Sequence, residues 1–259
     1  MFNTIAVIPA RMASTRFPGK PLKPILGIPM IGHVWKRTAM ALGVEKTFVA
    51  TCDKEIFDYI ESVGGRAVMT GDHHERCSDR TAEAMLKIEK ETGRVDIVVM
   101  VQGDEPLVTP DMIEQALAPF ASDSEVLVTN LMAELGSRKE HDDPNEVKVV
   151  ADLMGRALYF SREPIPSWKK GASDVPMYKQ VCVIPFRRDF LITFNELSST
   201  PLEQVESVDM LRVLEHGYKV HMVRTNARTV SVDTPVDLEA AERLMEKDTL
   251  FPAYKKELR

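Results

Sequence analysis

The segment 8–22, with the sequence IPARMASTRFPGKPL, combines three separated cations with small residues and has the composition of an anion-binding loop. Its cations are Arg11, Arg16 and Lys20. Small residues let backbone N–H groups approach phosphate oxygens, and Arg and Lys supply positive charge. The segment contains neither G-x-x-x-x-G-K nor G-x-G-x-x-G, so it is not a P-loop or a dinucleotide-binding fingerprint. It predicts a phosphate-binding loop of another kind, with a solvated basic turn as the alternative.

Two carboxylates follow apolar runs elsewhere in the chain. Asp104 lies in QGDEP directly after the apolar run 98–101, and Asp233 lies in VDTP just before a helical pattern. Carboxylate oxygens are hard ligands that can hold Mg²⁺ against substrate phosphates. If the two side chains meet, they form a two-carboxylate Mg²⁺ site. The simpler interpretations are a strand-ending turn for Asp104 and a second helix cap for Asp233.

A third group of residues could bind a metal of a different kind. His73, His74 and Cys77 offer imidazole and thiol groups, but a closed zinc site needs four ligands and no partner motif accompanies them. We therefore interpret the two histidines as solvated loop residues. Cys77 could act as a reactive thiol beside Arg76 and Arg80, although an ordinary loop cysteine is the simpler interpretation.

These segments need a scaffold that brings distant parts of the chain together. Over the first half, short apolar runs alternate with helical patterns. The predicted strands are 4–8, 46–51, 67–69 and 96–101, and the predicted helices are 30–42, 54–63, 78–91 and 110–120. This alternation predicts right-handed βαβ units and a parallel sheet. In such sheets, ligands bind beyond the carboxyl ends of the strands.

The middle of the chain differs, because strand patterns follow one another without helices between them. They lie at 126–132, 148–152, 157–160 and 178–186. We interpret them as a β-rich, antiparallel excursion on an α/β core. Helices at 187–194 and 201–215, a strand at 219–223 and a helix at 235–246 complete the predicted fold. No linker or repeat is visible, so we expect one domain over 1–259, with an insertion over roughly 133–200.

Composition and charge limit the class of protein. The 259 residues are 44% hydrophobic and 28% charged, which allows a large core and excludes disordered, collagenous and coiled-coil chains. Residues 1–44 hold six basic side chains and no acid, whereas the whole chain has a net charge of -6. An acidic body with a basic beginning argues against a nucleic-acid-binding protein and favours a site for a small anion.

The chain shows no sign of export or membrane insertion. The apolar run 5–9 is too short for a signal peptide core or a membrane span. The three cysteines are odd in number and lack CxxC spacing, so no disulfide framework is indicated. We expect a cytoplasmic protein.

Six segments together resemble the CMP-Kdo synthetases, the 3-deoxy-manno-octulosonate cytidylyltransferases of lipopolysaccharide synthesis. They are 8–22, 101–106, NEVKV at 145–149, ALYFSR at 157–162, LRVL at 211–214 and VDTP at 232–235. The similarity runs in order from about residue 4 to 246. It implies a Mg²⁺-dependent enzyme that couples CTP to a 3-deoxy-ulosonic acid and releases pyrophosphate. It also implies a homodimer, and an α/β fold with a Rossmann-like nucleotidyltransferase core, a mixed and mostly parallel sheet, and a β-rich dimerisation insertion.

The resemblance implies roles for individual residues. The catalytic residues would be Arg11, Lys20, Asp104 and Asp233, the two carboxylates being the Mg²⁺ ligands. The nucleotide would contact Ala10, Arg11, Arg16, Lys20, Ser78, Arg80 and Asp104. The sugar acid would contact Gln102, Arg162, Gln180, Glu203 and Glu206. Since the acceptor's own hydroxyl attacks the α-phosphorus, such a site needs positioning and charge but no protein nucleophile.

Two places depart from the family's pattern. After His74 the family usually has Ser-Gly-Thr, where this chain has RCS at 76–78; CTP remains the favoured nucleotide. Gln180 and Ile184 stand where relatives commonly have His and Tyr, which suggests an altered acceptor, with a relative of Kdo as the main rival to Kdo itself. Two further functions stay open: a nucleotidyltransferase that acts on a sugar 1-phosphate, and a non-catalytic nucleotide-binding relative. A lipopolysaccharide and a capsule pathway both stay open as well.

Overall fold

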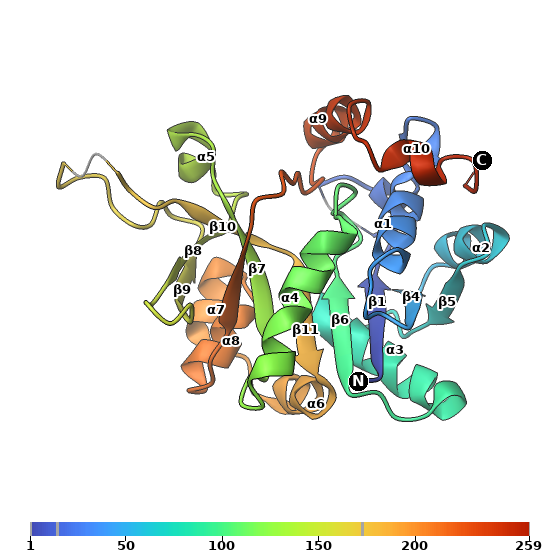
Figure 1. Cartoon of the computed structure of the whole chain (residues 1–259), viewed down its shortest axis with the longest axis horizontal. Coiled ribbons are helices and arrows are strands. Elements are labelled where there is room, and N and C mark those ends of the chain that lie inside the picture. Colours follow the sequence, from blue (N-terminus) through green and yellow to red (C-terminus); the bar gives the residue numbers. More distant parts are fainter. Residues whose placement is uncertain (1, 14–15, 172–173, 259) are drawn as a thin grey trace. The chain divides into compact units, whose positions relative to one another are not determined.

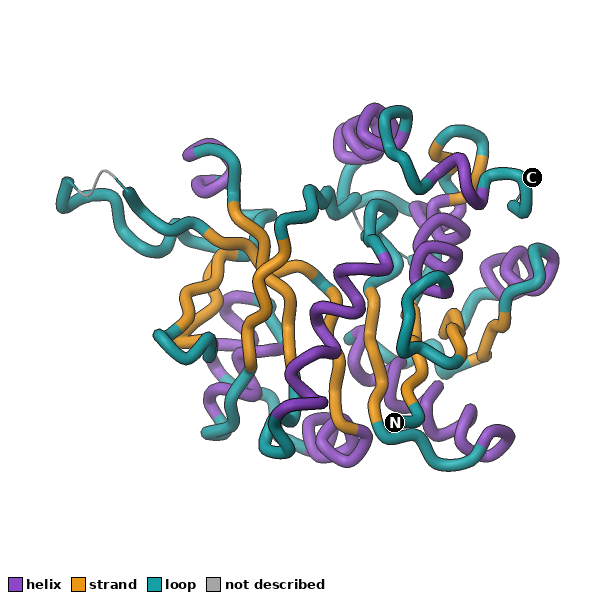
Figure 2. The backbone as a smooth tube through the Cα atoms, viewed as in Figure 1, coloured by secondary structure: helices purple, strands orange, loops and turns teal. Residues whose placement is uncertain are grey.

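The structure is a computed structural model that describes residues 2–13, 16–171 and 174–258, and the chain forms two compact units. Unit 1 comprises Met1–Glu114 and Arg228–Arg259, and unit 2 comprises Gln115–Ala227. Figures 1 and 2 show the helices and strands of each unit. The expected single domain over 1–259, with an insertion over roughly 133–200, stays a prediction.

The strands of unit 1 lie in the order β6-β1-β4-β5 and are all parallel (Figure 1). Their bounds are Thr4–Pro9 for β1, Lys46–Thr51 for β4, Arg66–Met69 for β5 and Ile97–Val101 for β6. Every residue of β1 and β6 is buried, as the continuous apolar runs of these strands predict for a parallel sheet covered on both faces.

Helices connect the strands of unit 1, and their bounds follow the predicted ones closely. They are α1 (Met30–Ala39), α2 (Lys54–Ser62) and α3 (Cys77–Thr92). After β6, α4 (Pro110–Ser122) begins in unit 1 and its residues from 115 belong to unit 2, while α9 (Pro235–Met245) and α10 (Phe251–Tyr254) lie in the last part of unit 1. A 3-10 helix, η1 (Lys20–Leu22), and the short strands β2 (Pro24–Ile25) and β3 (Ile28–Pro29) precede α1. The chain passes from β1 to β4 and β5 and then returns to the other side of β1 as β6. Right-handed crossovers therefore place α1 and α2 on one face of the sheet and α3 on the other.

Unit 2 is built on a mixed sheet with the strand order β12-β7-β10-β8-β9. The strands are β7 (Thr129–Glu134), β8 (Lys148–Ala151), β9 (Ala157–Ser161), β10 (Tyr178–Val181) and β12 (His221–Thr225), and β11 (Val183–Arg187) follows β10. The helices are α5 (Arg138–Asp142), α6 (Arg188–Glu196), α7 (Pro201–Glu206) and α8 (Met210–Glu215). β10 is antiparallel to β7 and β8, whereas β12 is parallel to β7. The predicted α/β class with a β-rich middle is confirmed.

Two predicted elements of unit 2 are wrong as single elements. The predicted strand 178–186 is interrupted at Cys182, where β10 ends and β11 begins. The predicted helix 201–215 ends at Ser207, whose φ of 53° lies in the left-handed region that interrupts an α-helix. Neither break is marked by glycine or proline, so the sequence carries no local signal for it. The short helices α5 and α10 were not predicted.

No helix within the described part of the chain is long and apolar enough to span a membrane.

A buried polar network fixes the C-terminal segment of unit 1 to α1. The His33 ring lies 2.8 Å from the Tyr254 hydroxyl and 2.9 Å from the Ile25 carbonyl oxygen. The fully buried Arg37 pairs with Asp248 at 2.7 Å, so its charge is compensated. Burial, assisted by the positive charge of Arg37, lowers the pKa of His33 to about 4. His33 is therefore neutral in the folded protein at neutral pH.

We expect the free energy of unfolding to fall by about 3 kcal/mol as the pH is lowered from about 6.5 to about 4 through His33 alone. In this window the unfolded chain protonates this histidine and the folded chain does not, so acid favours unfolding. Above pH 6.5 this histidine is neutral in both the folded and the unfolded chain, so the full free energy of unfolding is present there. Denaturant unfolding at several pH values measures it in the wild type, in His33→Asn, and in a control variant of the exposed His216, His216→Asn. An unchanged pH slope in His33→Asn would contradict the assignment.

Candidate functional site

Loops from the carboxyl ends of three adjacent strands carry the charged residues of unit 1. The loop after β1 holds Arg11 and Lys20, the loop after β6 holds Asp104, and Asp53 follows β4. The chain moves from β1 to β4 on one side, while β6 lies on the other side of β1. Such a reversal of strand order opens a crevice at the carboxyl edge, where α/β sheets bind ligands.

The ammonium group of Lys20 lies between two carboxylates. Its Nζ is 2.8 Å from Asp104 Oδ2 and 3.1 Å from Asp233 Oδ1, and it donates to the Val232 carbonyl at 2.9 Å. Arg16 adds a second cation, 3.0 Å from Asp233 Oδ1. Burial alone would lower the pKa of Lys20, but Asp104 and Asp233 together raise it above its ordinary value. The sequence left open whether the two carboxylates meet, and the structure brings them together on Lys20.

Backbone geometry directs Lys20 toward this edge of the sheet. Gly19 has a φ of 71°, in the left-handed region that favours glycine, and its N–H donates to the Met12 carbonyl at 3.0 Å. The turn begins η1, whose first residue is Lys20. On the opposite side, the Val232 N–H donates to the Asp104 carbonyl at 2.9 Å, which holds the two carboxylate segments together.

The donor set of this cluster suits a hard divalent cation. Asp104 Oδ1 is buried and has no hydrogen-bond partner among the described residues, so its lone pairs are available to a ligand. Carboxylate oxygens are the ligands that Mg²⁺ prefers in proteins. The cations Lys20 and Arg16 supply the positive charge that a bound polyphosphate would require. The residues present therefore fit a metal-assisted phosphate site.

Two other predicted nucleotide contacts of unit 1, Arg11 and Arg80, lie beside the loop 71–74. The Arg11 side chain is exposed and its Nη1 lies 3.4 Å from the His74 carbonyl oxygen. Ala10 is buried and continues the β1 ladder through a hydrogen bond from its N–H to Ala50. Ser14 and Thr15, in the same loop as Arg11, lie outside the described residues.

Ser78 and Arg80 are both buried in the first turn of α3. Arg80 Nη1 donates to Thr70 Oγ1 at 2.5 Å and to the Gly71 carbonyl at 3.1 Å, so its guanidinium is held in one orientation. Its Nη2 is buried without a hydrogen-bond partner among the described residues. This nitrogen is a donor that an approaching base or phosphate could use.

Four of the five predicted sugar-acid contacts lie in unit 2, and Gln102 directly follows β6 in unit 1. Arg162 and Glu206 form one cluster: Arg162 Nε donates to the Glu206 carbonyl at 2.6 Å, and the Arg162 N–H donates to Glu206 Oε2 at 2.7 Å. Glu206 Oε1 also accepts from the hydroxyls of Tyr159 and Ser161. The structure therefore joins two residues that lie 44 positions apart in the sequence.

Gln180 and Glu203 are held by protein partners. Gln180 Nε2 donates to Asn130 Oδ1 at 2.6 Å, across the β10–β7 pair. Glu203 is fully buried, receives both Nε and Nη2 of Arg212 at 2.8 and 2.6 Å, and forms a capping box with Thr200 at the start of α7. This geometry favours a structural role for Glu203, and its contact with a sugar acid stays a prediction.

Sequence reasoning missed Asp53, which supports the loop 8–22. Its Oδ2 accepts the Met12 N–H at 2.7 Å, directly after Arg11. The available signal was its position at the end of the predicted strand 46–51, on the same edge of the sheet as Asp104. Asn130, the partner of Gln180, was also missed, because nothing in the sequence pairs the two strands.

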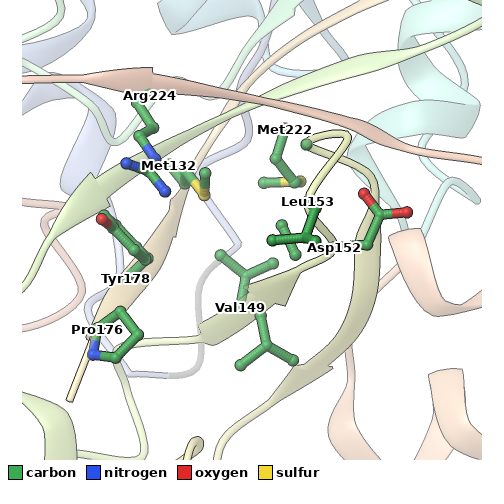
Figure 3. A pocket seen from close by; sticks show the side chains of 11 residues that line it. Met132, Val149, Asp152, Leu153, Pro176, Tyr178, Met222 and Arg224 are labelled. Carbon is green, nitrogen blue, oxygen red and sulfur yellow. The ribbon is translucent and has the colours of Figure 1, made fainter.

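Unit 2 contains a separate cavity of about 420 Å³, shown in Figure 3. Its lining residues are mostly apolar and come from β7, β8, the turn after β8, the loop before β10, β10 and β12. They are Met132, Val149, Val150, Ala151, Asp152, Leu153, Gly155, Pro176, Tyr178, Met222 and Arg224. The Arg224 guanidinium lies 4.9 Å from the centre of the Tyr178 ring. None of the residues predicted to bind nucleotide or sugar lines this cavity.

Comparison with known proteins places the chain among nucleotidyltransferases. A family model described as cytidylyltransferase matches residues 5–220. The 3-deoxy-manno-octulosonate cytidylyltransferase of Geobacter metallireducens is 42% identical over 95% of this chain and 98% of its own length. That of Geotalea uraniireducens is 44% identical over 92% of this chain and 98% of its own length. A solved CMP:2-keto-3-deoxy-manno-octonic acid synthetase complexed with CTP has a TM-score of 0.86 and 38% identity, covering 94% of this chain and 98% of that chain.

We expect Lys20→Met to lower the free energy of unfolding by about 1–3 kcal/mol at neutral pH, because two partly buried carboxylates then lose a shared charged donor. Added Mg²⁺ should recover stability more strongly in this variant than in the wild type. The control is Lys54→Met, whose lost pair with Asp58 is exposed and contributes less than about 1 kcal/mol. Thermal and denaturant unfolding measure both effects. Equal stability of the two variants would show that Lys20 does not hold the carboxylates together.

Proposed function

We propose an activity on the premise that this chain belongs to the family of 3-deoxy-manno-octulosonate cytidylyltransferases. The proposed enzyme couples CTP to Kdo or a closely related 3-deoxy-ulosonic acid and releases pyrophosphate. The observation that carries this proposal is the group formed by Lys20, Asp104 and Asp233 at the carboxyl edge of the unit 1 sheet. It combines cations for a triphosphate with oxygen ligands for a divalent metal. That combination is what nucleotidyl transfer requires.

The reaction places few chemical demands on protein side chains. The anomeric hydroxyl of the sugar acid attacks the α-phosphorus of CTP and its proton passes to solvent water. The bond from the α-phosphorus to the bridging oxygen breaks and releases pyrophosphate. Negative charge grows on that leaving group. We propose that three cations compensate this negative charge: Arg11, Arg16 and Lys20. Catalysis then depends on positioning and electrostatics, and the proposed mechanism uses no protein nucleophile.

We assign Mg²⁺ to Asp104 and Asp233. When bound, this ion would neutralise phosphate charge and lower the pKa of a coordinated hydroxyl. Lys20 now stands between the two carboxylates and keeps them close together before substrate arrives. With a metal ion held by the two carboxylates, the same ammonium would be available to pair with a phosphate oxygen.

The remaining contacts follow from the positions of the side chains. We assign Ala10, Ser78 and Arg80 to the nucleotide, supported by the buried Nη2 of Arg80, which has no hydrogen-bond partner within the described part of the chain. Gln102, Arg162, Gln180 and Glu206 are assigned to the sugar acid. Ile184 is 2% exposed in β11, and we assign the change in acceptor contacts mainly to Gln180. An amide in place of an imidazole changes the hydrogen bonds available to a sugar hydroxyl.

Pyrophosphate release should be fastest with CTP in a screen of four nucleoside triphosphates against Kdo and related 3-deoxy acids. Asp104→Asn and Asp233→Asn should each lower turnover by about 100-fold or more at saturating Mg²⁺, because each removes a charged oxygen ligand. The matched control is Asp58→Asn, an exposed carboxylate on α2.

Near-normal turnover of both variants would contradict the metal assignment. A nucleoside-diphosphate sugar formed from a sugar 1-phosphate would instead support the transferase that uses such substrates. Absence of pyrophosphate release with every acid would indicate a non-catalytic nucleotide-binding protein. Circular dichroism of each variant separates a loss of folding from a loss of chemistry.

We also propose a cytoplasmic homodimer assembled through unit 2. Three large apolar side chains lie exposed near one another along the chain, in the turn after β8 and in β9: Leu153, Met154 and Leu158, with exposed fractions of 106%, 72% and 62%. Exposed apolar groups of this size mark interaction surfaces. CTP is a cytoplasmic metabolite, which supports the location.

We expect the wild type to sediment as a dimer and the double variant Leu153→Asp, Leu158→Asp to sediment as a monomer. Charged groups on this surface would lose solvation on association. The control is Val236→Asp, which changes an exposed residue of α9 in unit 1. Sedimentation velocity measures the outcome, and a wild-type monomer at micromolar concentration would overturn the proposal.

A further inference from the structure

Unit 1 contains a second cluster of metal-binding side chains, formed by His73, His74 and Glu83. One ligand atom from each residue lies within 4.8 Å of the others. The two histidines belong to the loop between β5 and α3, and Glu83 lies in the second turn of α3. The rings of His73 and His74 are 4.2 Å apart between centroids. None of these residues has a part in the proposed nucleotidyl transfer.

The loop is closely fitted around Glu83. His74 Nε2 pairs with Glu83 Oε2, and the Gly71 N–H donates to the same oxygen at 3.0 Å. A Cβ at Gly71 would lie 2.3 Å from Cε1 of His73, so the imidazole rests directly against the glycine. Only glycine allows this approach without displacing the ring. The interpretation of His74 as a solvated loop residue is therefore wrong, because it is paired with α3.

The chemistry of this donor set differs from that of the Asp104 and Asp233 pair. Two imidazoles and one carboxylate form a set of three ligands with a fourth position open, an arrangement that proteins use for Zn²⁺. Imidazole nitrogen favours zinc over magnesium, whereas oxygen-only sites favour magnesium. The third ligand, Glu83, follows His74 by nine positions, and Cys77 is not part of the cluster.

We propose that His73, His74 and Glu83 bind one Zn²⁺ ion that braces the loop 71–74 against α3. The brace would act on neighbouring contacts, because the His74 carbonyl accepts from Arg11 and the Gly71 carbonyl accepts from Arg80. By holding the loop in place, the ion would stabilise the two carbonyl oxygens that accept hydrogen bonds from Arg11 and Arg80. The ion would take no part in the bond-making steps of the proposed reaction, and its binding needs no substrate.

One cation competes with the metal at this site. Lys87 Nζ lies 2.6 Å from Glu83 Oε1, and its side chain is 46% exposed. Its long, solvated stem lets it turn away when a divalent ion binds. Removing this ammonium should strengthen metal binding, a result that a purely structural cluster of hydrogen bonds would not produce.

Isothermal titration of the chelator-treated full chain with ZnCl₂, in excess Mg²⁺ to fill oxygen-only sites, tests the proposal. We expect one Zn²⁺ per chain, binding at least about tenfold weaker in His73→Ala and in Glu83→Gln, and tighter in Lys87→Met. His216→Ala, a histidine of unit 2, should bind Zn²⁺ like the wild type. Visible absorption of added Co²⁺ should show nitrogen-ligated bands that both ligand variants lose.

Equal zinc affinity in the wild type and both ligand variants would overturn the proposal, as would displacement of all bound Zn²⁺ by Mg²⁺. Absence of stoichiometric binding would do the same. Melting curves recorded without zinc show whether the ligand variants are folded. If they are not, the affinity of Lys87→Met still decides, because unchanged or weaker binding there would count against the site. Each readout is independent of catalysis, so failure of the proposed function leaves this test unaffected.

Discussion

The central constraint on unit 1 is the need to keep two carboxylates together at one edge of a sheet. Asp104 and Asp233 repel one another, and only a shared cation makes their proximity favourable. Lys20 supplies it from a third loop, at 2.8 and 3.1 Å. The left-handed turn at Gly19 and the backbone hydrogen bond between Val232 and Asp104 both support this contact.

The same constraint explains why the loop after β1 is supported from several sides. Asp53 accepts the Met12 N–H, and the exposed Arg11 reaches the His74 carbonyl. When no anion is bound, the cations of this loop repel one another unless nearby acceptors compensate their charge. Backbone carbonyls and carboxylates provide temporary partners for these groups. A Zn²⁺ ion at the proposed site would further fix the His74 carbonyl, which is one of these partners.

In unit 2 a buried charge is compensated by backbone carbonyl groups instead of carboxylate side chains. Lys148 is fully buried, and its ammonium donates to the carbonyls of Asp143, Glu146 and Arg162 at 2.7, 2.6 and 2.5 Å. Burial lowers the pKa of this lysine, and the nearby carboxylates oppose that shift. The arrangement fixes the backbone of Arg162, whose side chain is tied to Glu206 and Pro144. Buried polar groups thus orient the residues assigned to the sugar acid.

The sequence by itself determined the local elements and the kinds of chemistry. Strand 46–51 has its predicted bounds, and the loop 8–22 was identified from its cations, because apolar periodicity and side-chain charge are local properties. Only the tertiary structure decided which charges meet, since Lys20, Asp104 and Asp233 are far apart along the chain. It also decided that Glu203 is buried against Arg212 and that Glu83 joins His74, because burial and pairing depend on packing between distant segments.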